Sequence, residues 1–180
     1  NSSQRTFKNL AFPMRSPATG RIVGLELRGL PNKEGSSFKG MAQNSDATHG
    51  VWLASPNTDI TGSGKLRVAK QVYWFESAYD AMAFYQLHPR KAKLDGAVFI
   101  STGGSPSMQQ FKGVLAETEK ATHHLCFDRD HAGYMFTLNF AIARAKKNYT
   151  SYIATAIDEE KGIAKAGQLV VTDQSGNGAR

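Results

Sequence analysis

The amino-acid sequence predicts an α/β protein in which helices cover both faces of a parallel sheet. After about residue 65, strand-sized apolar runs alternate with amphipathic stretches of about ten to fifteen residues, the pattern that right-handed crossover connections produce. The chain has 180 residues, of which 41% are hydrophobic, which suffices to bury a core in one compact domain or one domain with a small appendage. Because Cys126 is the only cysteine, a disulfide framework and a cysteine-rich zinc module are excluded.

The predicted sheet has four parallel strands in the second part of the chain, at residues 71–75, 97–101, 123–127 and 149–156. Helices are expected at residues 78–87, 107–120 and 131–147. Apolar residues recur along these stretches with the spacing of a helix face. On the first helix the spacing predicts that Tyr79 and Tyr85 pack in the core, which disfavours a role as a topoisomerase nucleophile.

The first part of the chain is predicted to form a smaller, β-rich subdomain of mixed α+β character at residues 1–64. Short strands are expected at residues 10–14, 21–30, 38–41 and 51–54. Pro56, Gly62 and Gly64 then mark the boundary between the two parts. We therefore expect a second domain at residues 65–173 and a disordered tail at residues 174–180.

The charge of the chain indicates a polyanionic partner. The net charge is +7, and most of the basic excess lies in residues 1–100. Such an excess favours nucleic acid through long-range attraction and counterion release. No apolar run approaches the length of a membrane-spanning helix, and the N-terminus has no secretory pattern. We therefore expect no membrane partner, and we expect a piece of a longer cytoplasmic chain.

Acidic side chains follow two of the predicted strands. Glu76 comes directly after the first strand, and Asp128 and Asp130 follow the third. The carboxyl ends of parallel strands meet at one edge of a sheet, where ligands bind. Three carboxylates gathered there would repel one another unless a cation intervened, and their hard oxygen ligands suit Mg²⁺. The alternative is that these are ordinary loop acids and helix caps, with Asp130 as the N-cap of the helix that begins near residue 131.

A small loop with the sequence Ser-Thr-Gly-Gly follows the second strand. Gly103 and Gly104 could leave backbone N–H groups free to approach an anion. Arg129, between the two aspartates, would point away or reach a phosphate. The same edge of the sheet therefore combines candidate cation and phosphate ligands.

Three motifs in this order resemble those of the Toprim domain, which bacterial-type primases, topoisomerases and some nucleases share. They are Trp-Phe-Glu-Ser-Ala-Tyr-Asp-Ala-Met-Ala at residues 74–83, Ala-Val-Phe-Ile-Ser-Thr-Gly-Gly at 97–104 and Leu-Cys-Phe-Asp-Arg-Asp-His-Ala-Gly at 125–133. Upstream, Phe-Pro-Met at residues 12–14, the stretch at 20–28, and Phe-Lys at 38–39 with Asn-Ser at 44–45 resemble the segment that precedes Toprim in primases. The likeness is nearest to primase-like proteins encoded on plasmids, phages and conjugative elements.

The resemblance implies a Rossmann-like Toprim sheet of four parallel strands, joined to the small N-terminal subdomain in a primase catalytic centre. It implies that Glu76, Asp128 and Asp130 hold Mg²⁺, with Mn²⁺ as an alternative, and that Asp80 is a further catalytic acid. It also implies basic contacts to nucleotide phosphates or template. The residues at those basic positions are Arg28 and Lys39.

The function expected from the resemblance is Mg²⁺-dependent nucleotidyl transfer by a primase-like module of a larger replication or mobilisation protein. Its partners would be a single-stranded DNA template, nucleoside triphosphates, and other domains of a longer chain or a helicase. Ser77 stands where primases usually have glycine, and the single cysteine leaves no zinc module for template choice. Two alternatives therefore stay open: a Toprim nuclease that uses the same acids, and a non-catalytic module that binds single-stranded DNA.

Overall fold

The computed structural model describes residues 9–56, 59–60, 62–87, 96–145, 149–154, 157–158, 163–164 and 168–173. The N-terminal strands are β1 (Asn9–Arg15), β2 (Ile22–Gly29), β3 (Lys39–Met41) and β4 (Val51–Ala54), and a 3₁₀ helix, η1, follows at Lys65–Val68. The alternating part contains β5 (Gln71–Phe75), α1 (Ala78–Leu87), β6 (Ala97–Ser101), α2 (Met108–Glu117), β7 (Thr122–Leu125) and α3 (His131–Arg144). The last strands are β8 (Tyr149–Ala154), β9 (Ile157–Asp158), β10 (Ile163–Ala164) and β11 (Gln168–Asp173).

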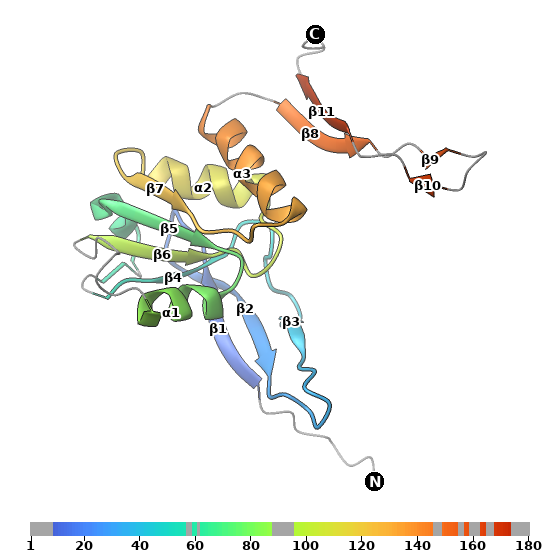
Figure 1. Ribbon diagram of the computed structural model, residues 1–180. Coiled ribbons are helices and arrows are strands. Elements are labelled where there is room, and N and C mark those ends of the chain that lie inside the picture. Colours follow the sequence, from blue (N-terminus) through green and yellow to red (C-terminus); the bar gives the residue numbers. More distant parts are fainter. Residues whose placement is uncertain are drawn as a thin grey trace.

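Seven strands form one sheet in the order β3-β2-β1-β4-β6-β5-β7. Strand β5 lies between β6 and β7 and pairs in parallel with both, whereas β4 pairs with β6 in the antiparallel direction. The N-terminal strands β1 to β4 thus extend the parallel sheet (Figure 1). The two parts of the chain share one sheet, and their division into domains at residue 64 stays a prediction.

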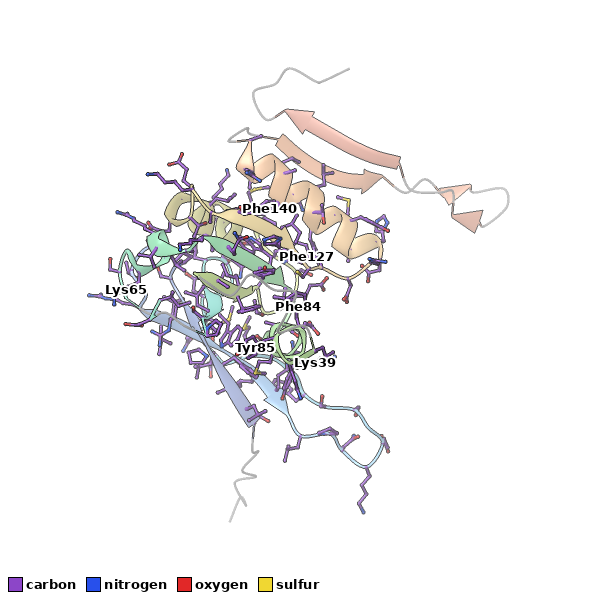
Figure 2. All side chains as sticks on the ribbon, turned by 60° about the vertical axis from the view of Figure 1, so that its left-hand side comes forward. Lys39, Lys65, Phe84, Tyr85, Phe127 and Phe140 are labelled. Carbon is purple, nitrogen blue, oxygen red and sulfur yellow. The ribbon has the colours of Figure 1, made fainter. Side chains whose placement is uncertain are left out.

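Helices cover both faces of the parallel part, with α1 on one side and α2 and α3 on the other (Figure 1). Successive side chains of a strand point to opposite faces, and β5 accordingly supplies both cores. Trp74, fully buried, packs edge-on against Phe111 and Phe140 on the α2–α3 side. Tyr73 packs with Phe84 on the α1 side. Figure 2 shows Phe140 and Phe84 on these two sides of the sheet.

The predicted α/β class with a parallel sheet between helices is confirmed, but the predicted fourth parallel strand is not part of this sheet. Its residues form β8, which pairs with β11 in the antiparallel direction over six residues, Tyr149↔Asp173 to Ala154↔Gln168. The run Gln-Leu-Val-Val-Thr-Asp of β11 is rich in β-formers and offers an antiparallel partner, which binds slightly better per residue than a parallel one. The predicted tail at residues 174–180 lies outside the described residues.

The two tyrosines of α1 are not in the core. Tyr79 is 41% exposed and Tyr85 is 43% exposed, because Ala78, Ala81 and Phe84 form the face that α1 turns to the sheet. The tyrosines lie on the flanks of that face. Their rings contact Phe12 and Phe99 edge-on.

None of the described helices is long and apolar enough to cross a membrane.

Candidate functional site

The carboxyl ends of the parallel strands meet at one edge of the sheet, and the acidic residues follow there. Glu76 comes directly after β5, and Asp128 lies beyond the end of β7. The backbone N–H of Asp128 donates a hydrogen bond to Glu76 Oε1 at 3.2 Å. The structure therefore brings together two acids that are 52 residues apart in the sequence.

The pKa of Glu76 reflects the charges gathered at this edge. Burial raises the pKa of its carboxyl group above the ordinary value, and the charges of Asp128, Asp130 and Asp80 raise it further. The hydrogen bond from the Asp128 N–H lowers the pKa, but does not cancel these effects. Asp128, Asp130 and Asp80 therefore all lie close enough to Glu76 to act on its carboxyl group.

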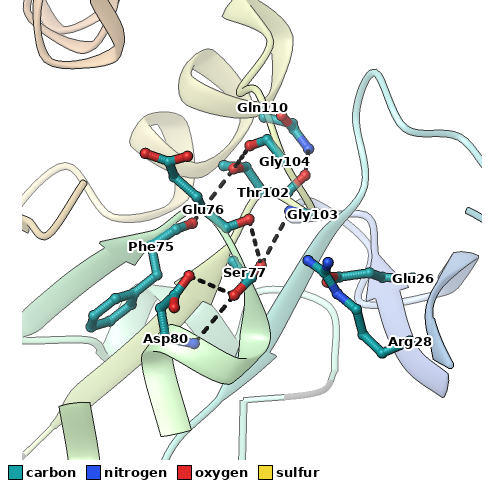
Figure 3. Close-up of polar contacts among 11 residues, drawn as sticks. Glu26, Arg28, Phe75, Glu76, Ser77, Asp80, Thr102, Gly103, Gly104 and Gln110 are labelled. Atoms are coloured by element: carbon teal, nitrogen blue, oxygen red, sulfur yellow. Dashed lines mark hydrogen bonds and ion pairs between the residues drawn. The ribbon is translucent and has the colours of Figure 1, made fainter. Parts of the chain in front are cut away.

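The loop between β6 and α2 fixes the backbone of Glu76 (Figure 3). The Glu76 carbonyl oxygen accepts hydrogen bonds from the Gly104 N–H at 2.8 Å and from Ser101 Oγ at 3.3 Å. The Gly103 N–H donates to Ser101 Oγ at 3.1 Å. The expectation that these two glycines offer free N–H groups to an anion is thus not met, because both groups already bind within the loop. Glycine suits the loop for its backbone geometry, since φ is +73° at Gly103 and +128° at Gly104.

A buried glutamine anchors this loop to the rest of the fold. Gln110 is fully buried, and its Nε2 donates to the carbonyl oxygens of Thr102 at 3.0 Å and Gly50 at 2.6 Å. Its Oε1 accepts from the Ser107 N–H, which closes a capping box at the start of α2. Sequence reasoning missed Gln110, although the Ser-x-x-Gln pattern was present to find it.

Ser77, the residue that departs from the primase pattern, organises Asp80. Its hydroxyl accepts a hydrogen bond from the Asp80 N–H at 3.2 Å and donates to Asp80 Oδ2 at 2.5 Å. The side chain therefore closes the first turn of α1 and orients the Asp80 carboxylate (Figure 3). Asp80 itself is exposed.

The Asp-Arg-Asp turn is packed tightly against the start of α3. Asp130 is the N-cap of this helix, and its Oδ1 accepts from the Gly133 N–H at 2.8 Å. A Cβ atom at Gly133 would collide with the carbonyl oxygen of Asp128. The alternative that Asp130 is the N-cap of this helix is therefore confirmed. The same residue also lies close enough to Glu76 for its charge to raise the pKa of Glu76. Arg129, between the two aspartates, is exposed.

The predicted basic residues lie on the N-terminal strands. Arg28 on β2 is directly opposite Lys39 on β3 in the antiparallel register, and Lys39 is exposed. Figure 3 shows Glu26 and Arg28 on one side of Ser77 and the side chains of Glu76 and Asp80 on the other. Sequence reasoning missed Glu26, although two residues that are two apart in a strand share one face.

The acidic edge fits a hard divalent cation by the chemistry of its donors. No lysine or arginine in the described ranges forms an ion pair with Glu76, Asp80, Asp128 or Asp130. Four carboxylates without a basic partner repel one another, and a cation would relieve that repulsion. Within the part of the chain that the structure describes, however, no three acidic, histidine or cysteine side chains are arranged to hold a metal ion.

Comparisons with known proteins agree with this geometry. Residues 73–166 match a family described as Toprim-like. This range begins in β5 and includes all four acids of the edge. No curated protein matches the chain.

Proposed function

The chain belongs to the Toprim-like family, and from that premise we propose that it is a primase-like module for metal-dependent nucleotidyl transfer on single-stranded DNA. Toprim domains process nucleic acids with the help of a metal ion, in primases, nucleases and topoisomerases. The observation that carries the proposal is the gathering of Glu76, Asp80, Asp128 and Asp130 at one sheet edge, where their charges raise the pKa of Glu76.

In this proposal Glu76, Asp128 and Asp130 hold Mg²⁺ or Mn²⁺. When bound, the ion would neutralise phosphate charge and align an attacking 3′-hydroxyl group. The loop at residues 101–104 keeps Glu76 in place through its carbonyl oxygen. Asp80, held by Ser77, would orient the site or bind a further ion, and the basic groups would bind phosphates of template or nucleotide. Those basic groups are Arg28, Lys39 and Arg129.

The N-terminal strands favour synthesis over cleavage. They carry the segment that resembles primases, and such a segment is not expected in a Toprim nuclease. In the structure β4 is hydrogen-bonded to β6, next to the acidic edge, with Trp52 opposite Ser101. The strands that carry Arg28 and Lys39 thereby belong to the same sheet as β5 and β7, which Glu76 and Asp128 follow. We also propose that the module works in the cytoplasm within a larger replication or mobilisation protein, alongside further domains or a helicase.

A second candidate function is a non-catalytic module that binds single-stranded DNA. Two observations favour it: no group of three metal ligands is assembled in the described ranges, and the net charge is +7. Basic domains bind nucleic acid without chemistry by releasing counterions from the strand.

One experiment separates synthesis, cleavage and passive binding. The chain is incubated with a labelled single-stranded DNA template, nucleoside triphosphates and Mg²⁺ or Mn²⁺, and the products are resolved on a denaturing gel. We expect new primer with the wild-type chain and none with Asp128→Ala. Asp46→Ala, a change of an aspartate outside the acidic edge, is the control and should leave synthesis intact.

Other outcomes would contradict nucleotidyl transfer or the role of the acidic edge in it. Shortened template that depends on Asp128 would assign the chain to the nucleases. Unchanged template with salt-sensitive binding would support the passive module. Synthesis that survives Asp128→Ala would refute the role of the acidic edge.

A further inference from the structure

A buried ion pair between Glu26 and Arg28 lies beside the loop at residues 101–104, and the proposed function does not explain it. Glu26 is only 1% exposed. Its Oε1 accepts from Arg28 Nε at 2.9 Å and lies 2.6 Å from Arg28 Nη2. The Arg28 side chain is 12% exposed, so part of it reaches the surface. One carboxylate oxygen therefore holds two nitrogens of the guanidinium group.

The other oxygen of this carboxylate has no partner. Glu26 Oε2 is buried without a hydrogen bond. It faces the loop at Gly103, where an added Cβ atom would lie 3.7 Å from Oε2 and closer still to the methyl groups of Met41 and Met14. A buried carboxylate with an unpaired oxygen is costly, and an isolated buried ion pair is weak support for a fold. A contribution to the stability of the fold therefore does not explain why this ion pair is present.

We infer that Glu26 is a positioning residue: it fixes the Arg28 guanidinium beside the loop at residues 101–104, where Arg28 binds a phosphate of the nucleic-acid strand. The inference rests on the proposed function, because it names a phosphate ligand for the same site. Guanidinium has five N–H donors. Glu26 engages two of its nitrogens, so donors remain for a phosphate.

The strands around Glu26 make it suited to this task. In the sheet register Glu26 lies opposite Phe12 of β1 on one side and Met41 of β3 on the other. Both neighbours are in regular ladders, so the backbone of Glu26 is fixed on two sides. An arginine held in this way loses less conformational entropy on binding phosphate than a free one would.

A double-mutant cycle tests the inference with single-stranded DNA as the probe. Affinity of the full chain for a fluorescent oligonucleotide is measured by anisotropy over a range of salt concentrations. Arg28→Ala should weaken binding about tenfold and reduce the slope of log affinity against log salt by about 0.7, the value for one single-strand phosphate contact. Glu26→Gln should weaken binding about threefold, because the guanidinium is held less firmly. In the Arg28→Ala background, Glu26→Gln should have no effect.

Matched controls separate position from charge and folding. Glu34→Gln and Arg21→Ala change exposed residues of the same hairpin region and should leave affinity and slope close to wild type. Arg28→Lys keeps the charge but loses the fork, and it should restore the salt slope without restoring the full affinity. Melting temperatures of all variants show whether they remain folded at the temperature of the assay.

Equal losses from Glu26→Gln with and without Arg28 would overturn the inference and leave the proposed function standing. If the Glu26→Gln variant does not fold, the Arg28→Lys variant tests the inference instead. An affinity of Arg28→Lys equal to that of wild type would overturn the inference. A wild-type chain that binds no single-stranded DNA would overturn both the inference and the proposed function.

Discussion

Glu76 is the residue whose ionisation gives the most direct test of the acidic edge. Its carbonyl oxygen is fixed by the loop at residues 101–104, and its carboxylate accepts from the Asp128 N–H. Burial and three neighbouring carboxylates raise its pKa. A glutamate with a raised pKa in the folded state favours its protonated form, so the fold loses stability as the pH rises through that pKa.

The first prediction concerns the pH dependence of stability. Glu76→Gln removes the charge and keeps the shape. In buffer without divalent cations, the variant should melt at a higher temperature than wild type at pH 8, because the raised pKa of Glu76 in the folded state costs stability above the ordinary pKa. Below the ordinary glutamate pKa of 4.5, the two melting temperatures should converge, because Glu76 is protonated in both the folded and unfolded states.

The measurement is thermal unfolding by circular dichroism from pH 4 to pH 8 at low ionic strength. Asp46→Asn is the opposite control, since hydrogen bonds from His49 lower the pKa of Asp46 and its ionised form favours the fold. That variant should lose stability at pH 8. A Glu76→Gln variant that melts below wild type at pH 8 would argue against like-charge repulsion at the edge.

At the scale of elements, the first turn of α3 sets the position of Asp128. The helix begins at His131 with Asp130 as its N-cap. Gly133, in the same turn, approaches the Asp128 carbonyl oxygen so closely that no side chain fits between them. The helix and the Asp-Arg-Asp turn therefore form one packed unit.

The second prediction is that Gly133→Ala disrupts this unit. The new methyl group must displace the backbone of Asp128 or the helix, which should cost about 1–3 kcal/mol in the free energy of unfolding. Gly113→Ala in α2 is the matched control, because a Cβ atom there meets only Pro17 at 3.5 Å. That change should raise stability by about 0.5–1 kcal/mol through helix propensity.

Urea denaturation of both glycine variants measures these differences. The activity of Gly133→Ala in the primer assay should fall further than its loss of stability explains, because Asp128 moves. Equal stability of the two variants would show that the turn is not packed as described.

At the scale of the whole molecule, the sequence predicted the parallel core well because its signals are local. The bounds of β5, β6 and α1 agree with those predicted, since each element begins or ends at an abrupt change from apolar to polar residues, such as Phe75-Glu76. Strand alternation also places His123 and His124 on opposite faces of β7. His123 accepts from Trp74 Nε1, whereas His124 stacks on Tyr73.

The features that sequence reasoning missed depend on contacts distant in the chain. The antiparallel pairing of β8 with β11 competes with parallel pairing to the main sheet, and no local pattern decides between them. The Gly103 and Gly104 amides are occupied because Ser101 and the Glu76 carbonyl oxygen lie within reach in the fold. Glu26 becomes notable only through its burial.

The proposed function depends on one property of the whole molecule: acids from separate segments hold one divalent cation. Manganese binding to the full chain, followed by electron paramagnetic resonance, tests it most directly. Wild type should bind Mn²⁺, whereas Asp128→Asn and Glu76→Gln should each lose that binding, and the half-exposed control Asp46→Asn should retain it. Binding that persists in both edge variants, or a wild-type chain that takes up no Mn²⁺, would contradict the account.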